Sequence, residues 1–93
     1  MHDVQFIWDL PDEPDGNYAH IAEHDVTPDE YEEAFHDDPS PPGTSRSSGR
    51  PIKFGWTSTG KHLGVVFEIV LDDPFTVYPV TAFPAPPRRG KKS

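Results

Sequence analysis

Two histidines one helical turn apart are the first residues of this chain whose spacing suits chemistry. His20 and His24 stand at positions i and i+4 of the segment "HIAEH", so on a helix they would share one face. Two-histidine metal sites use this spacing. The order differs from the HExxH motif of metalloproteases, however, and no third ligand has a supporting spacing. We therefore expect these histidines to pack or to cap a helix end, and we keep metal binding as the alternative.

A second set of polar residues has the properties needed to cleave RNA without a metal. Such cleavage needs cations that stabilise charge on the phosphate, together with a general base and a general acid. Besides the helix histidines, the candidates are Arg50, Lys53, Lys61, His62, Glu68 and Tyr78. An exposed lysine on a strand also has a simpler role, which is to prevent aggregation at the edge of a sheet. The composition therefore permits a ribonuclease site without defining one.

Other common chemistries lack their motifs in this sequence. It contains no G-x-S-x-G element that would present a nucleophilic serine. It also has no glycine-rich loop placed before a helix, where backbone amides would bind a phosphate. We expect no cofactor and no metal requirement.

Aromatic residues recur in the second half of the chain. They are Phe54, Trp56, Phe67, Tyr78 and Phe83. Exposed aromatic side chains could stack the bases of single-stranded RNA. The hydrophobic content is only 33%, however, and a small domain needs its large apolar residues for its core. We therefore expect these aromatic residues to be mainly core, with base stacking as the alternative.

The first half of the chain predicts one strand and two short helices. The apolar run of residues 4–8 predicts a strand, and a loop rich in Pro and Asp follows. Apolar residues at helical spacing predict a helix over residues 17–24, which ends at Asp25 in a left-handed conformation. Thr27 and Glu30 then form a capping box for a helix that ends near residue 36.

From residue 50 the apolar period changes from 3.6 to 2, which predicts a sheet. Three strands are expected as an antiparallel meander over residues 50–57, 62–71 and 75–83. In the first of them Lys53 lies on the face opposite Phe54. Pro79 cannot donate a ladder hydrogen bond, so it indicates an edge strand or a bulge.

This order of elements predicts an α+β fold, with an N-terminal strand, two short helices and then the three-stranded meander. The helices have one place to bury their apolar stripes, namely one face of the sheet, and the other face stays open. We expect a single domain over residues 1–83 and a proline-rich, basic tail over residues 84–93 that does not pack. Residues 37–49 are expected to be a loop.

Charge is divided unevenly along the chain. The net charge is −8, and residues 1–45 hold 13 Asp or Glu and no Lys or Arg. Residues 46–93 hold all 8 Lys or Arg, so only this half is suited to face RNA. Cysteine is absent, and neither a signal peptide nor an 18-residue apolar run is present. We expect a cytoplasmic protein without a membrane span.

The order of these motifs resembles the BrnT family of RelE-like toxins. The segments that carry the resemblance are "FIWD", "EHDVTPDEYEEAFHD" and "GRPIKFGWTSTGKHLGVVFE", and it extends over residues 5–83. His24 matches the histidine of the family's His-Gly-Val motif, and Arg50 matches a basic residue that opens the second strand. Where the family has Ser-Ala-Arg in its last strand, this chain has Phe83 and Pro84.

The resemblance implies a RelE-like fold and a toxin–antitoxin role. It implies metal-independent RNA cleavage and a partner that is an antitoxin or another small protein. The candidate catalytic residues are His24, Arg50, Lys53, Lys61 and Glu68. The missing arginine and the acidic first half keep a second hypothesis open, in which the chain is a non-catalytic protein-interaction module with the same fold.

Overall fold

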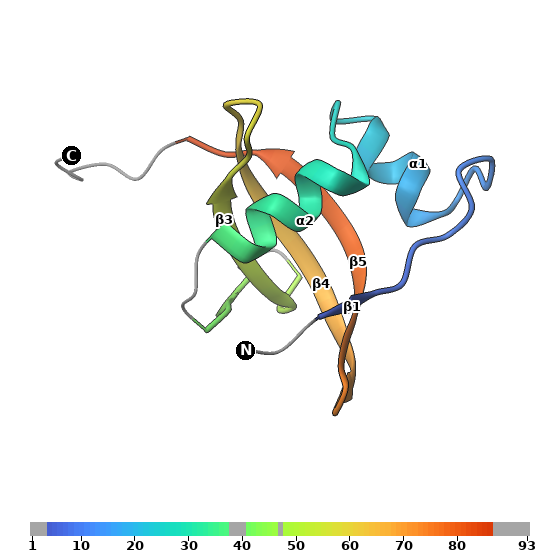
Figure 1. The fold of residues 1–93 in the computed structure, drawn as a ribbon, viewed down its shortest axis with the longest axis vertical. Coiled ribbons are helices and arrows are strands. Elements are labelled where there is room, and N and C mark those ends of the chain that lie inside the picture. The colour runs from blue at the N-terminus through green and yellow to red at the C-terminus, as the bar shows by residue number, and fades with distance from the viewer. Residues whose placement is uncertain (1–3, 38–40, 47, 87–93) are drawn as a thin grey trace, which may run out of the picture.

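The computed structural model describes residues 4–37, 41–46 and 48–86, and these form an α+β structure (Figure 1). The elements in chain order are β1 (Gln5–Phe6), α1 (Asn17–Ala22), α2 (Pro28–Asp37), β2 (Gly43–Thr44), β3 (Pro51–Trp56), β4 (His62–Asp72) and β5 (Phe75–Pro84). The five strands make one open sheet in the order β1-β5-β4-β3-β2. The predicted α+β class is confirmed.

The sheet is mixed rather than purely antiparallel. β3, β4 and β5 pair antiparallel with their chain neighbours, whereas β1 runs parallel to β5. β2 pairs antiparallel with β3 in a segment that the sequence placed in a loop, so that expectation was wrong at residues 43–44. A two-residue strand is too short to show a period of 2, and its pairing with β3 is what defines it.

Both helices cover the same face of the sheet, as Figure 1 shows. α1 contacts β5, and α2 contacts β3 and β4. The buried core between them consists of Ile21, Val26, Tyr31, Ala34, Phe35, Leu63, Val65, Phe67, Val77 and Ala82. Because residues of one strand alternate between faces, the side chains that alternate with this core lie on the far side of the sheet.

We call that far side the open face. In the paired register its members are Ile52, Phe54 and Trp56 of β3, His62, Gly64, Val66 and Glu68 of β4, and Tyr78, Thr81 and Phe83 of β5. Arg50 extends the same alternation just before β3. Both helices pack on the other side of the sheet. On the open face Phe54 and Trp56 are exposed, Ile52, Gly64 and Val66 are buried, and the Tyr78 hydroxyl bonds to Asp9.

The corner between the helices follows the predicted local signals. The Thr27 amide donates to Glu30 Oε1 at 3.1 Å, and the Glu30 amide donates to Thr27 Oγ1 at 3.2 Å. This is the reciprocal capping box. Asp25 has φ = 61°, the left-handed conformation that turns the chain out of α1. The helix before it ends at Ala22, earlier than expected, which leaves His24 in the turn.

The face of β3 that packs against the helices is not the one that the sequence predicted. α2 lies directly over Gly55, where a Cβ atom would come within 2.1 Å of the Ala34 carbonyl oxygen. Only glycine allows this approach, so the side of β3 that carries Lys53 and Gly55 faces the helices. Phe54 and Trp56 therefore point to the open face, and the expectation that they belong to the core was wrong.

β5 ends differently from its expected boundary. A register shift beside Pro79 agrees with the bulge, which was one of the two alternatives predicted for this residue. The strand continues to Pro84, and the Ala85 amide donates to the His62 carbonyl at 2.8 Å. The first residues of the predicted tail are thus attached to the sheet, and residues 87–93 lie outside the described part of the chain.

Candidate functional site

Four aromatic rings meet at one end of the open face. We call Phe54, Trp56, His62 and Phe83 the aromatic cluster. The ring centroids of Trp56 and His62 are 4.8 Å apart, and Phe54 lies 6.3 Å from His62 and 6.5 Å from Phe83. Phe54 is 42% exposed and Trp56 is 48% exposed. Large apolar side chains grouped in this way on a surface are typical of binding sites.

Gly64 makes this arrangement of rings possible. A Cβ atom there would come within 2.6 Å of the Phe83 ring and 3.0 Å of the Phe54 ring. Because glycine has no side chain, the two rings lie across the central strand. Gly64 is therefore buried beneath the Phe54 and Phe83 rings.

His62 connects the cluster to the end of β5. Its Nδ1 lies 3.0 Å from the Ala85 carbonyl oxygen, which can only accept, so Nδ1 carries the proton in this contact. Together with the backbone hydrogen bond between Ala85 and His62, this contact fixes the ring beside Trp56. Pro84, by contrast, lies opposite Leu63, whose side chain belongs to the helix-side core.

Arg50 and Glu68 lie together at the other end of the open face. Arg50 Nε donates to Glu68 Oε2 at 2.8 Å, and their side chains are 42% and 51% exposed. These are two of the five candidate catalytic residues, and they are in direct contact. The contact also means that the positive charge of Arg50 is paired with the negative charge of Glu68.

Lys53 lies on the helix side of the sheet. Its Nζ is 5.0 Å from the centre of the Phe35 ring, a distance at which a cation is attracted to an aromatic face. The side chain is half-buried. It therefore does not share a face with Arg50 and Glu68.

Lys61 joins the β3–β4 hairpin to the start of α2. Its Nζ lies 3.1 Å from Glu30 Oε1 and 3.5 Å from Asp25 Oδ2, and it also donates to the Asp25 carbonyl. Its hydrogen bond with Glu30 raises the pKa of Lys61, against the opposing effect of desolvation. The lysine is thus a structural link in this position.

Glu30 is the buried partner in this link. Burial raises its pKa, but hydrogen bonds from Thr59, the Thr27 amide and Lys61 together outweigh burial, so that the pKa lies below its usual value. The carboxylate is therefore held in its charged form by three partners on two segments, the corner before α2 and the β3–β4 hairpin.

His24 is exposed in the turn after α1, in the helix layer. Its ring lies 6.3 Å from that of His20, and the described residues contain no group of three or more His, Cys, Asp or Glu that could hold a metal ion. The candidate catalytic residues thus occupy separate places. Arg50 and Glu68 meet on the open face, whereas His24, Lys53 and Lys61 lie on the helix side.

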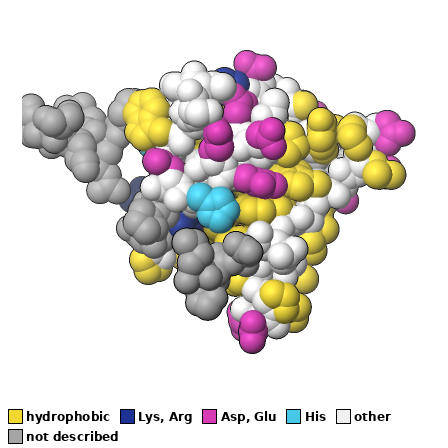
Figure 2. Space-filling model, in the orientation of Figure 1, with side chains coloured by type: hydrophobic (Ala, Val, Ile, Leu, Met, Phe, Trp, Pro, Cys, Tyr) yellow, Lys and Arg dark blue, Asp and Glu magenta, His cyan; other side chains and the backbone are white. Residues whose placement is uncertain are grey.

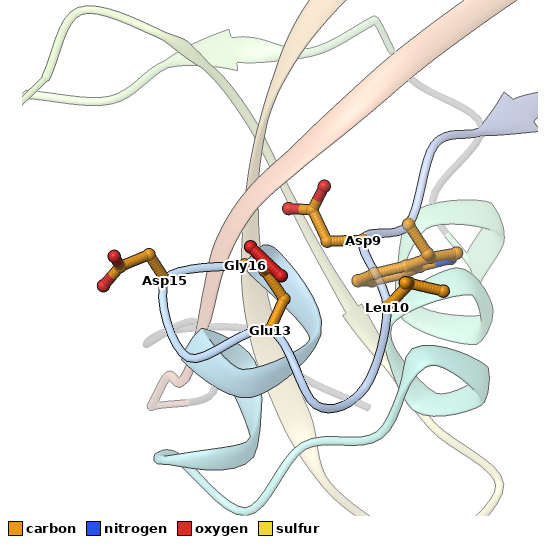
Figure 3. Close-up of a pocket in the computed structure, with 6 residues that line it drawn as sticks. Asp9, Leu10, Glu13, Asp15 and Gly16 are labelled. Carbon is orange, nitrogen blue, oxygen red and sulfur yellow. The ribbon is translucent and has the colours of Figure 1, made fainter.

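The loop between β1 and α1 forms a separate hollow of about 470 Å³ (Figure 3). It is lined by Trp8, Asp9, Leu10, Glu13, Asp15 and Gly16. The Tyr78 hydroxyl donates to Asp9 Oδ2 at 2.6 Å, and the backbone amide of Asn17 donates to the same oxygen at 2.9 Å. These bonds lower the pKa of Asp9, and the bond to Asp9 raises the pKa of Tyr78.

Acidic side chains are prominent on the helix layer. Figure 2 views the helix layer and shows acidic side chains over α2. Asp29 and Glu33 belong to this helix, and neither Lys nor Arg occurs in residues 1–45. The acidic residues of α2 thus lie on the side of the sheet opposite the open face.

Known proteins give no direct guide to this site. No family model matches the chain, and neither the curated proteins nor the solved structures include a match. Neither helix of the described residues is long and apolar enough to span a membrane. The molecule is therefore defined by its own geometry, as an α+β protein with an acidic helix layer and an aromatic open face.

The sequence named the residues of the aromatic cluster but not their role. The signal that could have found them is the pairing of aromatic residues with a glycine on the neighbouring strand. Phe54 lies opposite Gly64, and Gly64 lies opposite Phe83. Ala85 gave no signal at all, because its role depends on where β5 ends beside His62.

Proposed function

We propose that this chain is a non-catalytic protein-interaction module that binds its partner through the aromatic cluster. The observation that carries the proposal is the exposure of Phe54 and Trp56 on a sheet face that no helix of the described residues covers. Aromatic residues of this kind supply much of the binding energy at protein interfaces.

The positions of the candidate catalytic residues support binding rather than catalysis. Catalysis requires a base, an acid and a cation within reach of the same reacting atoms. Here Lys61 is held by Glu30 and Asp25, and Lys53 lies over Phe35 on the helix side. Arg50 and Glu68 lie on the other face of the sheet, and they bind each other.

Charge also favours a protein partner over a polyanion. Binding to nucleic acid depends on cations that neutralise phosphates. Among the described residues of the open face, Arg50 is the one Lys or Arg, and it is paired with Glu68. An aromatic, nearly neutral surface is better suited to the apolar side chains of another protein.

A comparison of variants in a pull-down tests the proposal. The full chain, with an affinity tag, is used to capture partners, alongside a Phe54→Ser/Trp56→Ser double variant. Leu10→Ser serves as the control, because Leu10 is 69% exposed and lies in the loop between β1 and α1. We expect one stoichiometric protein partner that the double variant loses and the control retains. A partner retained equally by all three proteins would refute the role of the cluster.

A second candidate function follows from the contact between Arg50 and Glu68. In the BrnT-like proposal, with its RelE-like fold and antitoxin partner, these two residues would act on RNA. Glu68 would take the proton from a ribose 2′-hydroxyl, and the 2′ oxygen would attack the phosphorus while Arg50 stabilises the charge on the phosphate. The bond to the 5′ oxygen would break, and that oxygen would take a proton from water.

Incubation of RNA with the full chain in EDTA separates the two functions. The interaction-module proposal predicts no cleavage. Cleavage that is lost in Arg50→Ala and Glu68→Gln but kept in the exposed-turn variant His24→Ala would establish the ribonuclease at the open face. Cleavage lost only in His24→Ala would place the chemistry in the helix layer instead.

A further inference from the structure

The hairpin of β4 and β5 continues past the start of β3, as the lower end of Figure 1 shows. The last pair between β3 and β4 in this direction joins Ile52 and Val66, whereas β4 runs on to Asp72. Among the described residues, no strand pairs with this last part of β4 on the side away from β5, and no loop backbone bonds to it. We call this side of residues 67–72 the β4 edge.

The turn between β2 and β3 explains why the β4 edge is uncovered. The Ser45 amide donates to the Arg50 carbonyl at 2.7 Å, and Gly49, with φ = 74°, lets the chain turn in this short connection. The line of β3 therefore ends at Arg50, whose side chain bonds to Glu68. Residues 69–72 are left without a neighbouring strand in line with β3 in the described part of the chain.

Backbone groups of this edge point outward, toward the place that a further strand would occupy. In an antiparallel sheet, alternate residues direct their amides and carbonyls to opposite neighbours. The His62 carbonyl accepts from the Ala85 amide after β5, and the Lys61 carbonyl accepts from Thr57 or its neighbours on the β3 side. Odd-numbered residues of β4 therefore point toward β3, and Ile69 continues this series past its end. Unpaired groups on a strand edge are the groups to which another strand bonds.

Three consecutive apolar side chains lie exposed along this edge. Ile69, Val70 and Leu71 are 44%, 54% and 50% exposed. A strand that offers both unpaired backbone and apolar side chains is suited to receive an extended segment, because the backbone bonds and the side-chain contacts form together. The β4 edge thus combines the two features of a strand-addition site.

Charge selects the kind of segment that fits. Asp72 and Asp73 are exposed and directly follow the apolar run, whereas Glu68 at the other end is already paired with Arg50. A cation on the added strand would be favoured beside the two aspartates. A second copy of this chain fits poorly, because antiparallel pairing centred on Val70 would set Glu68 opposite Asp72, and like charges in opposite positions destabilise a sheet.

We propose that the β4 edge binds an extended apolar segment of another protein as an additional strand, with a Lys or Arg of that segment beside Asp72 and Asp73. Backbone hydrogen bonds supply the affinity, and contacts with the exposed apolar side chains supply the specificity. The site lies at the opposite end of β4 from His62 and the aromatic cluster. The inference therefore goes beyond the proposed function and does not depend on it.

Binding of defined peptides to the full chain tests the inference. Probe one is the fluorescein-labelled peptide Lys-Val-Thr-Val-Thr-Val-Lys. In probe two the inner amides of the same peptide are N-methylated, which removes the donors of a strand and keeps its side chains and charge. In probe three Glu replaces both lysines. Fluorescence anisotropy gives each dissociation constant. We expect probe one to bind about tenfold more tightly than probe two and about threefold more tightly than probe three.

Matched variants locate the binding site. Val70→Lys places a cation on the edge, which opposes strand addition and repels the lysines of probe one, so we expect about tenfold weaker binding. Leu10→Lys is the control, because Leu10 is 69% exposed in the loop between β1 and α1, and it should bind probe one as the unchanged protein does. Asp72→Asn should weaken probe one about threefold without weakening probe three. Circular dichroism verifies that each variant is folded.

The outcomes separate this inference from the proposed function. Equal binding of probes one and two would overturn strand addition. Binding that is lost in Phe54→Ser/Trp56→Ser but kept in Val70→Lys would place the peptide on the aromatic cluster, so the inference would fail while the interaction module stands. If the unchanged chain sediments as a dimer that Val70→Lys dissociates, the occupant is a second copy and the inference is wrong. Peptide binding at the β4 edge, with a pull-down partner that the double variant retains, would support the inference and refute the role of the cluster.

Discussion

At the scale of single residues, Asn17 is the buried polar group on which the first loop depends. Its Oδ1 accepts from the Asp9 amide at 2.8 Å, and its Nδ2 donates to the carbonyls of Ile7 and Pro79 at 2.9 and 3.0 Å. One side chain thus links the loop, the end of β1 and β5. Its removal would leave several of these backbone groups without partners.

We expect Asn17→Ala to lower the free energy of unfolding by about 2–3 kcal/mol, because buried polar groups lose their hydrogen bonds. Asn17→Asp should cost at least as much, since a carboxylate cannot donate to the two carbonyls. Urea denaturation measures both, with the exposed Asp12→Ala as the control, which should change stability by less than about 0.5 kcal/mol. An Asn17→Asp protein as stable as the unchanged chain would contradict this role.

Glu30 gives the protein a stability that depends on pH. Its pKa in the folded state lies below the value of 4.5 that it has when free. The carboxylate therefore stabilises the fold above about pH 4.5, and this contribution is lost as the pH falls through the folded pKa. Lys61 has the opposite sign, because its raised pKa contributes stability that is lost only at strongly alkaline pH.

We expect Glu30→Gln to be less stable than the unchanged protein at pH 7, by about 1–2 kcal/mol, since the bonds from Thr59 and Lys61 are weakened. The difference should shrink as the pH falls below about 4.5 and through the lowered pKa of Glu30, because protonation of Glu30 removes the same interactions. Urea midpoints at three pH values measure this, with the exposed Glu23→Gln as the control. A difference that stays constant with pH would exclude Glu30 as the titrating group.

At the scale of elements, the contact between α2 and β3 decides which face of β3 is buried under the helices and which is exposed. A Cβ atom on Gly55 would meet the backbone oxygen of Ala34, which cannot move away without a shift of the helix. A Cβ atom on Gly43 in β2 would have no such neighbour within 4 Å. Gly55 is therefore a tightly packed position, and Gly43, which has free space around it, is its matched control.

We expect Gly55→Ala to lower the free energy of unfolding by about 1–3 kcal/mol, because overpacking displaces the helix. Gly43→Ala should stay within about 0.5 kcal/mol of the unchanged protein. Thermal denaturation followed by circular dichroism measures both. If the two substitutions had equal effects, the close contact between α2 and Gly55 would not exist in solution.

At the scale of the whole molecule, the two faces of the sheet have different roles. Phe67 is completely buried under the helices, whereas Phe54 is 42% exposed on the open face. We expect Phe67→Ala to cost about 3–5 kcal/mol of stability. Phe54→Ala should cost much less and should act mainly on partner binding. Urea denaturation checks both, and equal losses would mean that the open face is part of the core.

Local signals in the sequence determined where the helices begin and end and where the last strand is interrupted. The capping box of Thr27 and Glu30, the left-handed Asp25 and the bulge at Pro79 were all predicted, because each depends on neighbours along the chain. The period of 2 predicted β3, and an apolar run and the turns around it predicted β4 and β5, which together gave the α+β class. These features need only short-range sterics and hydrogen bonding.

Tertiary structure decided which side of each element faces the helices. Alternation along β3 separates Phe54 from Gly55, but it cannot say which of them lies under α2, since either face could pack against a helix. The close fit of Gly55 against Ala34 settles this and leaves the aromatic residues exposed. The separation of His24 and Lys53 from Arg50 and Glu68 has the same cause, because residues distant in the chain meet only through packing that no local pattern encodes.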